Sequence, residues 1–71
     1  MKNRIRVLRA EFDMTQSQLA EHIGVSRQSI VAIENSKYVP STILALKMAK
    51  LFNTDVSNIF SLEDTDGSVD F

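Results

Sequence analysis

The sequence predicts an all-α domain of five short helices. Through residues 1–60 the apolar side chains recur at helical spacing, and no segment alternates apolar and polar residues as a half-buried strand would. Gly24 and Pro40 interrupt these apolar patterns, so each predicted helix is short. Residues that favour the N-cap of a helix precede every predicted helix after the first: Thr15, Ser26, Ser41 and Asp55.

Caps and apolar stripes also set the boundaries of the predicted helices. Thr15 and Gln18 form a capping box, in which each side chain satisfies a backbone N–H group of the other residue. Asp55, with Asn58 three residues later, opens the last helix. The five predicted helices cover residues 3–12, 16–23, 27–35, 42–52 and 55–60.

Length and composition indicate one ordinary globular domain. The chain has 71 residues, of which 44% are apolar and 24% charged. It has no cysteine, which excludes disulfides and thiolate metal sites. No apolar run approaches the ~20 residues that span a bilayer, and the first residues lack the apolar core of a signal peptide. We therefore expect a cytoplasmic protein without a membrane segment.

Charge divides the chain into two parts. All 8 Lys and Arg residues precede residue 61, whereas the segment 61–71 contains acidic residues and no base. This segment also lacks helical periodicity, so we expect a folded domain over residues 1–60 and an acidic tail over 61–71. The net charge of −1 thus leaves the domain with an excess of basic residues, which a DNA-binding surface needs locally.

Residues 16–35 have the spacing of two helices that cross at a tight turn. Ala20 is small enough to let the second helix cross close to the first, and Gly24 suits a left-handed helix end. Apolar residues fill the wedge between the two helices: Val25, Ile30 and Ile33. This combination predicts a helix-turn-helix, whose second helix reads the major groove of DNA.

The outer face of the predicted third helix carries the candidate base-reading residues. Its first turn contains Arg27, which can pair with guanine O6 and N7, and Gln28, which can pair with adenine N6 and N7. Val31 and Ala32 are apolar yet point outward, as expected for contacts with thymine methyl groups. The alternative is that Arg27 and Gln28 only solvate a surface helix.

Candidate contacts with the DNA backbone flank this helix. Gln16 lies in the first turn of the second helix, where free N–H groups and the helix dipole favour an anion. Lys37 and the backbone near Asn35 form a second candidate phosphate clamp, unless Lys37 is simply a solvated loop lysine. We place the remaining supporting contacts at Ser26, Ser29 and Arg6.

Other polar residues are predicted to be structural. Arg9 and Glu34 border the apolar faces of the first and third helices, where an ion pair can join them. His22 is the only histidine and is predicted to be exposed. The sequence offers no catalytic set, phosphate loop or metal cluster, so we expect neither enzymatic activity nor a cofactor.

Two segments, LRAEFDMTQSQLAEHIGVSRQSIVAIENSK and PSTILALKMAKLF, resemble the lambda-repressor-like helix-turn-helix family, the Cro and XRE-type transcriptional regulators. The resemblance covers about residues 3–60, and its most specific parts are TQ-x-x-LA and GVSR-x-x-I-x-x-IE. It implies a five-helix DNA-binding domain that acts as a dimer on a palindromic operator. It also implies the roles given above, with Ser29 and Ala32 at positions that support base reading.

Three residues depart from the pattern of that family. Asp13 and Ser36 stand where the family often has glycine; Asp tolerates a left-handed backbone, whereas Ser does so less well. Asn35 is the alternative residue for that helix end. Ile43 stands at a position that is often polar, which indicates a partner surface or a local shift of register.

These features together predict a sequence-specific regulator of transcription that represses by occupying its operator. A dimer, formed at least on DNA, presents two recognition helices about 34 Å apart. We expect its interface at the C-terminal helix: Ile59, Phe60 and Leu62. The alternative is an antitoxin or protein-interaction partner whose DNA binding is autoregulatory. The acidic tail is then a partner-binding segment, a solubilising segment or a competitor of DNA for the basic face.

Overall fold

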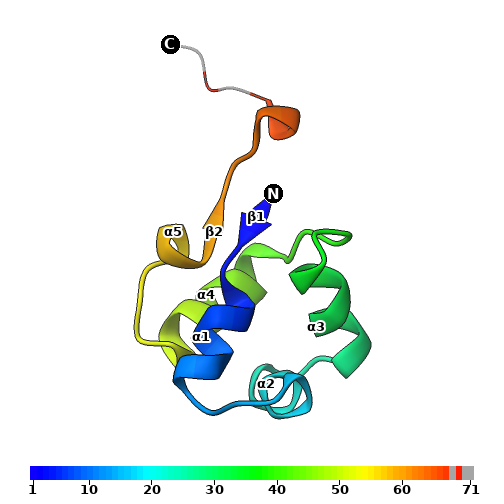
Figure 1. The fold of residues 1–71 in the computed structure, drawn as a ribbon, viewed down its shortest axis with the longest axis vertical. Helices are drawn as coiled ribbons and strands as arrows, with labels where there is room; N and C mark the ends of the chain where they lie inside the picture. Colours follow the sequence, from blue (N-terminus) through cyan, green and yellow to red (C-terminus); the bar gives the residue numbers. More distant parts are fainter. Residues whose placement is uncertain (68, 70–71) are drawn as a thin grey trace.

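Over residues 1–67 and 69, which are the part of the chain that the structure describes, the computed structural model contains five α-helices, one small sheet and one 3₁₀ turn (Figure 1). The mostly helical fold confirms the predicted all-α class. The helices are α1 (Ile5–Glu11), α2 (Gln16–Ile23), α3 (Arg27–Glu34), α4 (Thr42–Leu51) and α5 (Val56–Ile59). The other elements are β1 (Lys2–Asn3), β2 (Phe60–Ser61) and η1 (Asp64–Asp66).

Three helices begin at the caps that the sequence predicts. The Thr15 hydroxyl accepts a hydrogen bond from the Gln18 N–H at 3.0 Å, and the Gln18 side chain accepts one from the Thr15 N–H at 2.9 Å. The hydroxyls of Ser26 and Ser41 accept the corresponding bonds at the starts of α3 and α4. These bonds satisfy backbone donors that have no partner within the helix.

The start of α5 differs from its prediction. Asp55 is the N-cap residue, but its side chain makes no capping hydrogen bond. The Asn58 side chain instead donates to the Thr54 hydroxyl at 2.9 Å. The helix ends at Ile59 because Phe60 has an extended backbone and joins β2.

Three helices end on a left-handed residue that is not glycine. The φ angles of Asp13, Ser36 and Asn53 are 51°, 59° and 53°. After each of them the next N–H donates to a carbonyl five residues earlier, as from Lys37 to Ala32 at 2.9 Å. This bond is typical of the Schellman motif. The alternative that Asn35 takes the left-handed position is wrong, because its φ is −85°.

Substitution of Ser36 by glycine and by alanine separates the backbone strain at this helix end from its hydrogen bond. The Ser36 hydroxyl donates to the Met1 carbonyl at 2.9 Å, and both substitutions remove that bond. Only glycine also removes the Cβ atom that a left-handed backbone disfavours. We expect Ser36→Gly to unfold with a free energy about 1 kcal/mol higher than Ser36→Ala in urea titrations. Equal unfolding free energies would argue against strain at this position.

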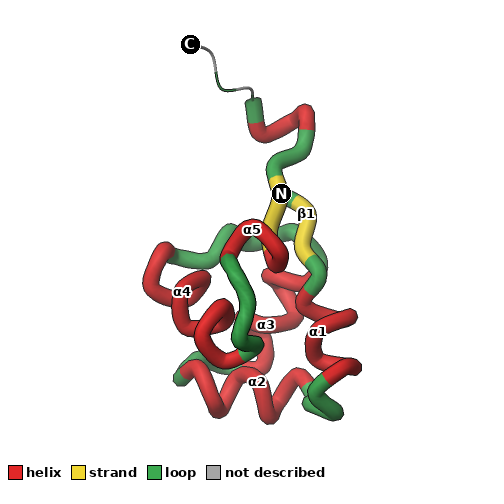
Figure 2. The backbone as a smooth tube through the Cα atoms, turned by 90° about the vertical axis from the view of Figure 1, so that its left-hand side faces the viewer, coloured by secondary structure: helices red, strands yellow, loops and turns green. Residues whose placement is uncertain are grey.

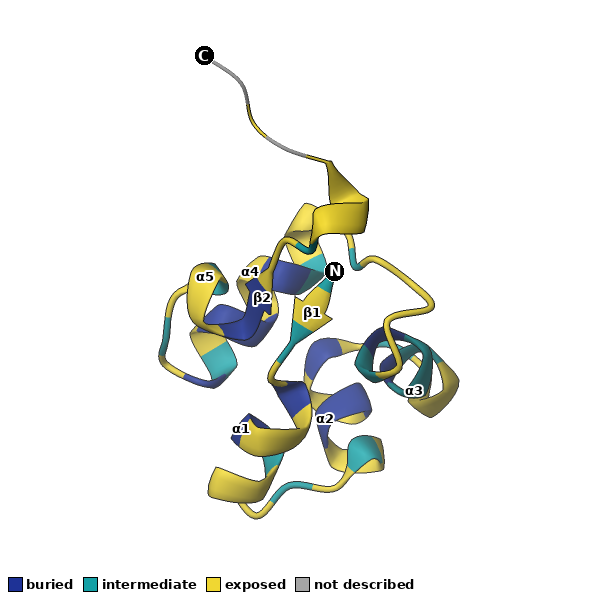
Figure 3. Ribbon diagram, turned by 45° about the horizontal axis from the view of Figure 1, so that its top comes forward, coloured by how far each residue is buried: buried dark blue, intermediate teal, exposed yellow. Residues whose placement is uncertain are grey.

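The core lies where the five helices meet (Figure 3). Every helix contributes at least one buried apolar residue, and each large side chain that leaves water contributes about 1.5–3 kcal/mol. The buried residues are Ile5, Leu8, Leu19, Ala20, Ile23, Ile30, Ile33, Ala45, Met48, Ala49, Phe52, Ile59 and Phe60.

The sheet is an element that the sequence did not predict. β1 and β2 pair antiparallel, with Lys2 opposite Ser61 and Asn3 opposite Phe60. Asn3 therefore does not begin the first helix, which starts at Ile5 instead. The Asn3 side chain donates to the carbonyls of Ile33 and Glu34, at 2.9 and 3.3 Å. The amino-terminal strand thus satisfies carbonyl groups at the end of α3.

The first part of the predicted acidic tail forms the 3₁₀ turn η1 and contacts the amino terminus. The Met1 amine lies 3.2 Å from Glu63 and 3.1 Å from Asp66. The hydrogen bond with Asp66 raises the pKa of the amine, and bonds from the Glu63 N–H and the amine lower the pKa of Asp66. Figures 1 and 2 place η1 beyond the sheet, away from α2 and α3. Residues 68, 70 and 71 of the predicted tail lie outside the described residues.

Candidate nucleic-acid interface

Helices α2 and α3 form a compact unit around a tight turn. Leu19 and Ala20 of α2 are buried, as are Ile30 and Ile33 of α3. Gly24 has a φ of 77°, and its N–H donates to the Ala20 carbonyl at 2.9 Å. No atom lies near the place of a Cβ at Gly24, so the backbone angle rather than space favours glycine.

The outer face of α3 lies open beside this buried face. Arg27 and Gln28 are exposed in its first turn, on the outer face where the sequence predicts them. Val31 and Ala32 are half-buried, so they offer part of an apolar surface to the outside. Polar side chains at one end and small apolar groups along the middle suit the edges of bases in a major groove.

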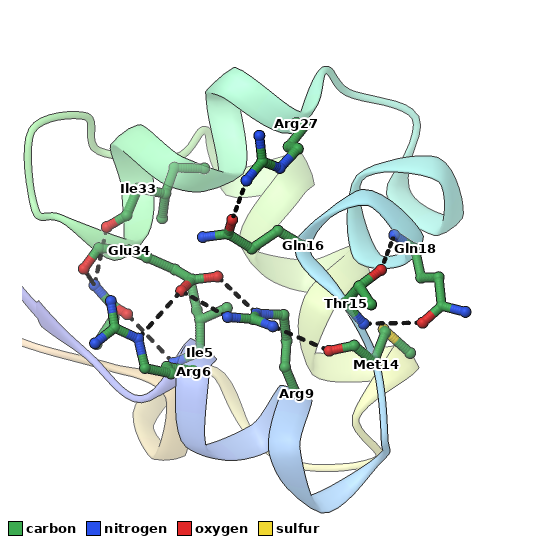
Figure 4. A network of polar contacts seen from close by, with 11 residues as sticks. Ile5, Arg6, Arg9, Met14, Thr15, Gln16, Gln18, Arg27, Ile33 and Glu34 are labelled. Atoms are coloured by element: carbon green, nitrogen blue, oxygen red, sulfur yellow. Dashed lines mark hydrogen bonds and ion pairs between the residues drawn. The ribbon is translucent and has the colours of Figure 1, made fainter.

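Arg27 and Gln16 are joined by a hydrogen bond across the starts of the two helices. The Gln16 carboxamide oxygen accepts from Arg27 Nη2 at 3.2 Å (Figure 4). Two residues that the sequence assigns to different parts of a DNA interface therefore lie side by side on one face. This bond uses one N–H group of the Arg27 guanidinium. The other N–H groups of Arg27 remain available to an acceptor outside the protein.

The remaining candidate backbone contacts lie at both ends of α3. The hydroxyls of Ser26 and Ser29 lie 3.0 Å apart, and the Ser26 hydroxyl also caps the helix. Asn35 is the exposed C-cap residue, and Lys37 is an exposed residue of the loop that follows. The structure thus brings these residues around one helix, with the Lys37 side chain exposed.

Arg9 and Glu34 form a bidentate ion pair between α1 and α3. Arg9 Nε donates to Glu34 Oε2 at 2.8 Å, and Arg9 Nη2 donates to Glu34 Oε1 at 3.1 Å (Figure 4). Arg9 Nη1 also donates to the Met14 carbonyl at 3.0 Å. The side chains are only 14% and 2% exposed, so the pair is almost entirely removed from water. Arg9 therefore fixes the position of α3 relative to α1.

Arg6 lies beside the same carboxylate rather than apart from it. Its Nε atom is 3.7 Å from Glu34 Oε1, while its side chain is 75% exposed. We expected Arg6 at the DNA backbone, and the structure directs its guanidinium toward Glu34. A contact with DNA thus competes with this longer and solvent-screened ion pair.

Tyr38 adds a residue to this face that the sequence reasoning missed. It lies in the loop after α3 and lines a shallow hollow of about 300 Å³ together with Ser26, Gln28, Ser29 and Ala32. Its side chain is 48% exposed. The only available signal was an aromatic residue between a basic residue and a proline, which does not predict packing against α3.

Two kinds of feature are absent from the described residues. These residues contain no group of three His, Asp or Glu side chains placed to bind a metal ion. None of the helices within 1–67 and 69 is long and apolar enough to cross a membrane. His22 is exposed on α2, as predicted.

Fold and site together define a helix-turn-helix DNA-binding domain. Two short helices cross at a glycine turn, the second presents a polar outer face, and an ion pair fixes it to the first helix of the domain. The chain belongs to the XRE-like helix-turn-helix family of transcriptional regulators, whose helix-turn-helix pattern matches residues 5–59. This membership confirms the resemblance read from the sequence, and it makes the chain a DNA-binding regulator.

Relatives of similar length come from bacteria and archaea. The chain is 47% identical to the HTH-type transcriptional regulator YgzD of Bacillus subtilis, over 90% of this chain and 97% of that protein. It is 50% identical to an HTH-type transcriptional regulator of Methanocaldococcus jannaschii, with the same coverage of both chains. It is also 30% identical to the CTXphi transcriptional repressor RstR of Vibrio cholerae, over 89% of this chain and 57% of that protein.

Proposed function

We propose that this protein is a sequence-specific repressor whose α3 enters the major groove of its operator. One observation carries this proposal: Arg27 and Gln28 are exposed at the start of α3, while the opposite face of the helix is buried in the core. Arg27 reads a guanine and Gln28 an adenine, and Val31 and Ala32 lie against thymine methyl groups. The likeness to RstR, a transcriptional repressor, supports repression, and occupancy of the operator is the mode that we propose.

Contacts with the phosphate backbone position α3 in this proposal. Gln16 and the free N–H groups at the start of α2 bind one phosphate, beside Arg27. Lys37 and the backbone near Asn35 bind another at the far end of α3. Ser26, Ser29 and Arg6 support the two clamps. Such contacts carry no sequence information but set the register of the helix in the groove.

Selection of bound duplexes from a random pool tests the proposal directly. The full chain is mixed with duplexes that contain a randomised stretch, and bound molecules are recovered and sequenced over several rounds. We expect enrichment of one sequence with two inverted half-sites, their centres about 10 base pairs apart. Recovery of an unenriched pool would overturn the proposal, whatever the affinity for total DNA.

The proposed dimer uses a surface that differs in part from the one that the sequence predicts. Ile59 and Phe60 are 1% and 8% exposed, because they belong to the core, so Ile59 is not available to a second protomer and Phe60 offers only a small surface at the groove described below. Leu62 is exposed, as are three apolar residues of α4 and its preceding loop: Val39, Ile43 and Leu46. A groove of about 220 Å³ lies along Val39 and Leu46. We place the dimer interface on this apolar surface.

Leu46→Glu tests the position of this interface. Burial of a charge opposite an apolar partner is costly, so we expect the dimer to weaken at least about tenfold. Sedimentation velocity over a range of concentrations, with and without the selected operator, measures the change. Val7→Glu is the matched control, because Val7 is an exposed apolar residue of α1 that does not line the groove. An unchanged dimer of Leu46→Glu would exclude this surface.

The alternative function, an antitoxin or partner protein with autoregulatory DNA binding, draws on the same groove and on the exposed acidic residues of η1, Asp64 and Asp66. It predicts a different experimental outcome. The groove would then bind a partner protein rather than a second copy of the chain, so Leu46→Glu would leave the affinity for the operator unchanged.

A further inference from the structure

A hollow beside α3 is lined by residues to which DNA contacts are assigned above and by Tyr38, which has no assigned contact. Four of its lining residues lie at the start and on the outer side of α3: Ser26, Gln28, Ser29 and Ala32. The fifth is Tyr38, from the loop after α3. The hollow is shallow and opens to solvent on the face that carries Arg27 and Gln28, so a base edge presented to that face can reach it.

The loop that carries Tyr38 is held on both sides. The N–H groups of Ser36 and Lys37 donate to carbonyls of α3 at 3.0 and 2.9 Å. The Ser36 hydroxyl is bound to the Met1 carbonyl, and Pro40 restricts the backbone two residues after Tyr38. The backbone next to Tyr38 is therefore held against the end of α3, which favours a specificity contact.

The lining of the hollow combines apolar walls with hydrogen-bond donors. The Ala32 methyl group and the Tyr38 ring are apolar, whereas Gln28 offers carboxamide N–H groups. The hydroxyls of Ser26 and Ser29 bond to each other, which uses one of their two protons and leaves the other for an outside acceptor. Thymine matches this pattern because its methyl group and its O4 acceptor are neighbours in the major groove.

We propose that this hollow receives the 5-methyl group of one thymine in each operator half-site, and that Tyr38 is the specificity-determining residue that closes it. The inference rests on the proposed function and adds a residue from outside α3 to base reading. The methyl group lies between Ala32 and the Tyr38 ring, and thymine O4 accepts a hydrogen bond from the serine hydroxyl that the Ser26–Ser29 bond leaves free. Tyr38 thus links the loop after α3 to the choice of base.

Deoxyuridine substitution tests the proposal, because it removes only the methyl group and keeps the base pair. Each thymine of the selected half-site is replaced in turn, and dissociation constants are measured for the wild-type chain, Tyr38→Ala and Tyr38→Phe. For the wild type we expect one position at which uracil weakens binding about three- to fivefold. Tyr38→Ala should lose that sensitivity, while Tyr38→Phe should keep it because the ring remains.

Three results would overturn the proposal. The first is that Tyr38→Ala binds the thymine operator as tightly as the wild type, the second is that it keeps the full uracil effect, and the third is that it weakens operator and random duplexes equally. The last result assigns Tyr38 to a phosphate instead of a base. Melting curves of each variant monitor folding, which half-exposed Tyr38 affects little. Failure of the proposed function appears separately, because the wild-type chain would then select no operator at all.

Discussion

Glu34→Ala is expected to lower the free energy of unfolding by about 3–5 kcal/mol, because it leaves the Arg9 charge buried without its partner. The Glu34 carboxylate accepts two hydrogen bonds from Arg9, and its side chain is only 2% exposed. A domain of this size has roughly 4–10 kcal/mol of stability, so a large part of it is lost. Thermal unfolding followed by circular dichroism should show a midpoint lower by roughly 12 °C or more.

Two comparisons separate the ion pair from a general effect of the substitution. Glu21→Ala removes an exposed carboxylate of α2 and should change the midpoint little. The double variant Arg9→Met/Glu34→Leu removes both charges, and we expect it to recover most of the stability, because no uncompensated charge remains. If Glu34→Ala melts like Glu21→Ala, the ion pair does not stabilise the fold.

Arg27→Ala should weaken binding to the selected operator by about 1–3 kcal/mol, which is roughly five- to 150-fold. The loss falls on one base pair, because Arg27 points outward in the first turn of α3 and can bond guanine O6 and N7. Removing the guanidinium also frees Gln16, which otherwise accepts from it at 3.2 Å. Selection with the variant should therefore show relaxed preference at one position of each half-site.

Lys37→Ala is the matched control for the loss of one positive charge. If Lys37 binds a phosphate, its removal weakens binding to all duplexes about equally. It also reduces, by about one, the slope of the logarithm of the binding constant against the logarithm of salt concentration. Arg27→Ala should instead lower the ratio of the affinity for the operator to the affinity for random duplexes. An Arg27→Ala chain that selects the same operator as the wild type would remove Arg27 from base reading.

The starts of most helices follow from the sequence because they depend on nearby atoms. A hydroxyl at Thr15, Ser26 or Ser41 reaches a backbone N–H three residues away, whatever the rest of the chain does. The same holds for the buried face of α3, which follows from helical spacing alone. Asp55 shows the limit of this reasoning, since Asn58 bonds to Thr54 and the expected side-chain cap does not form.

Features that join distant segments could not be read in the same way. The sheet pairs two-residue strands nearly 60 positions apart, and two residues are too few to show a period. The Asn3 contact with the end of α3 and the burial of Phe60 both follow from that pairing. The place of Tyr38 beside Ala32 likewise depends on how the loop after α3 turns back.

The amino-acid sequence alone determined the helical class, the helix-turn-helix and the outward residues of α3, because spacing and caps act within a few residues. Only the tertiary structure decided which polar and apolar groups are engaged and which are available. It bonded Asn3 to carbonyls at the end of α3, buried Ile59 and Phe60, and left Leu46 exposed. Such choices depend on the packing of elements from the whole chain, which local pattern does not encode.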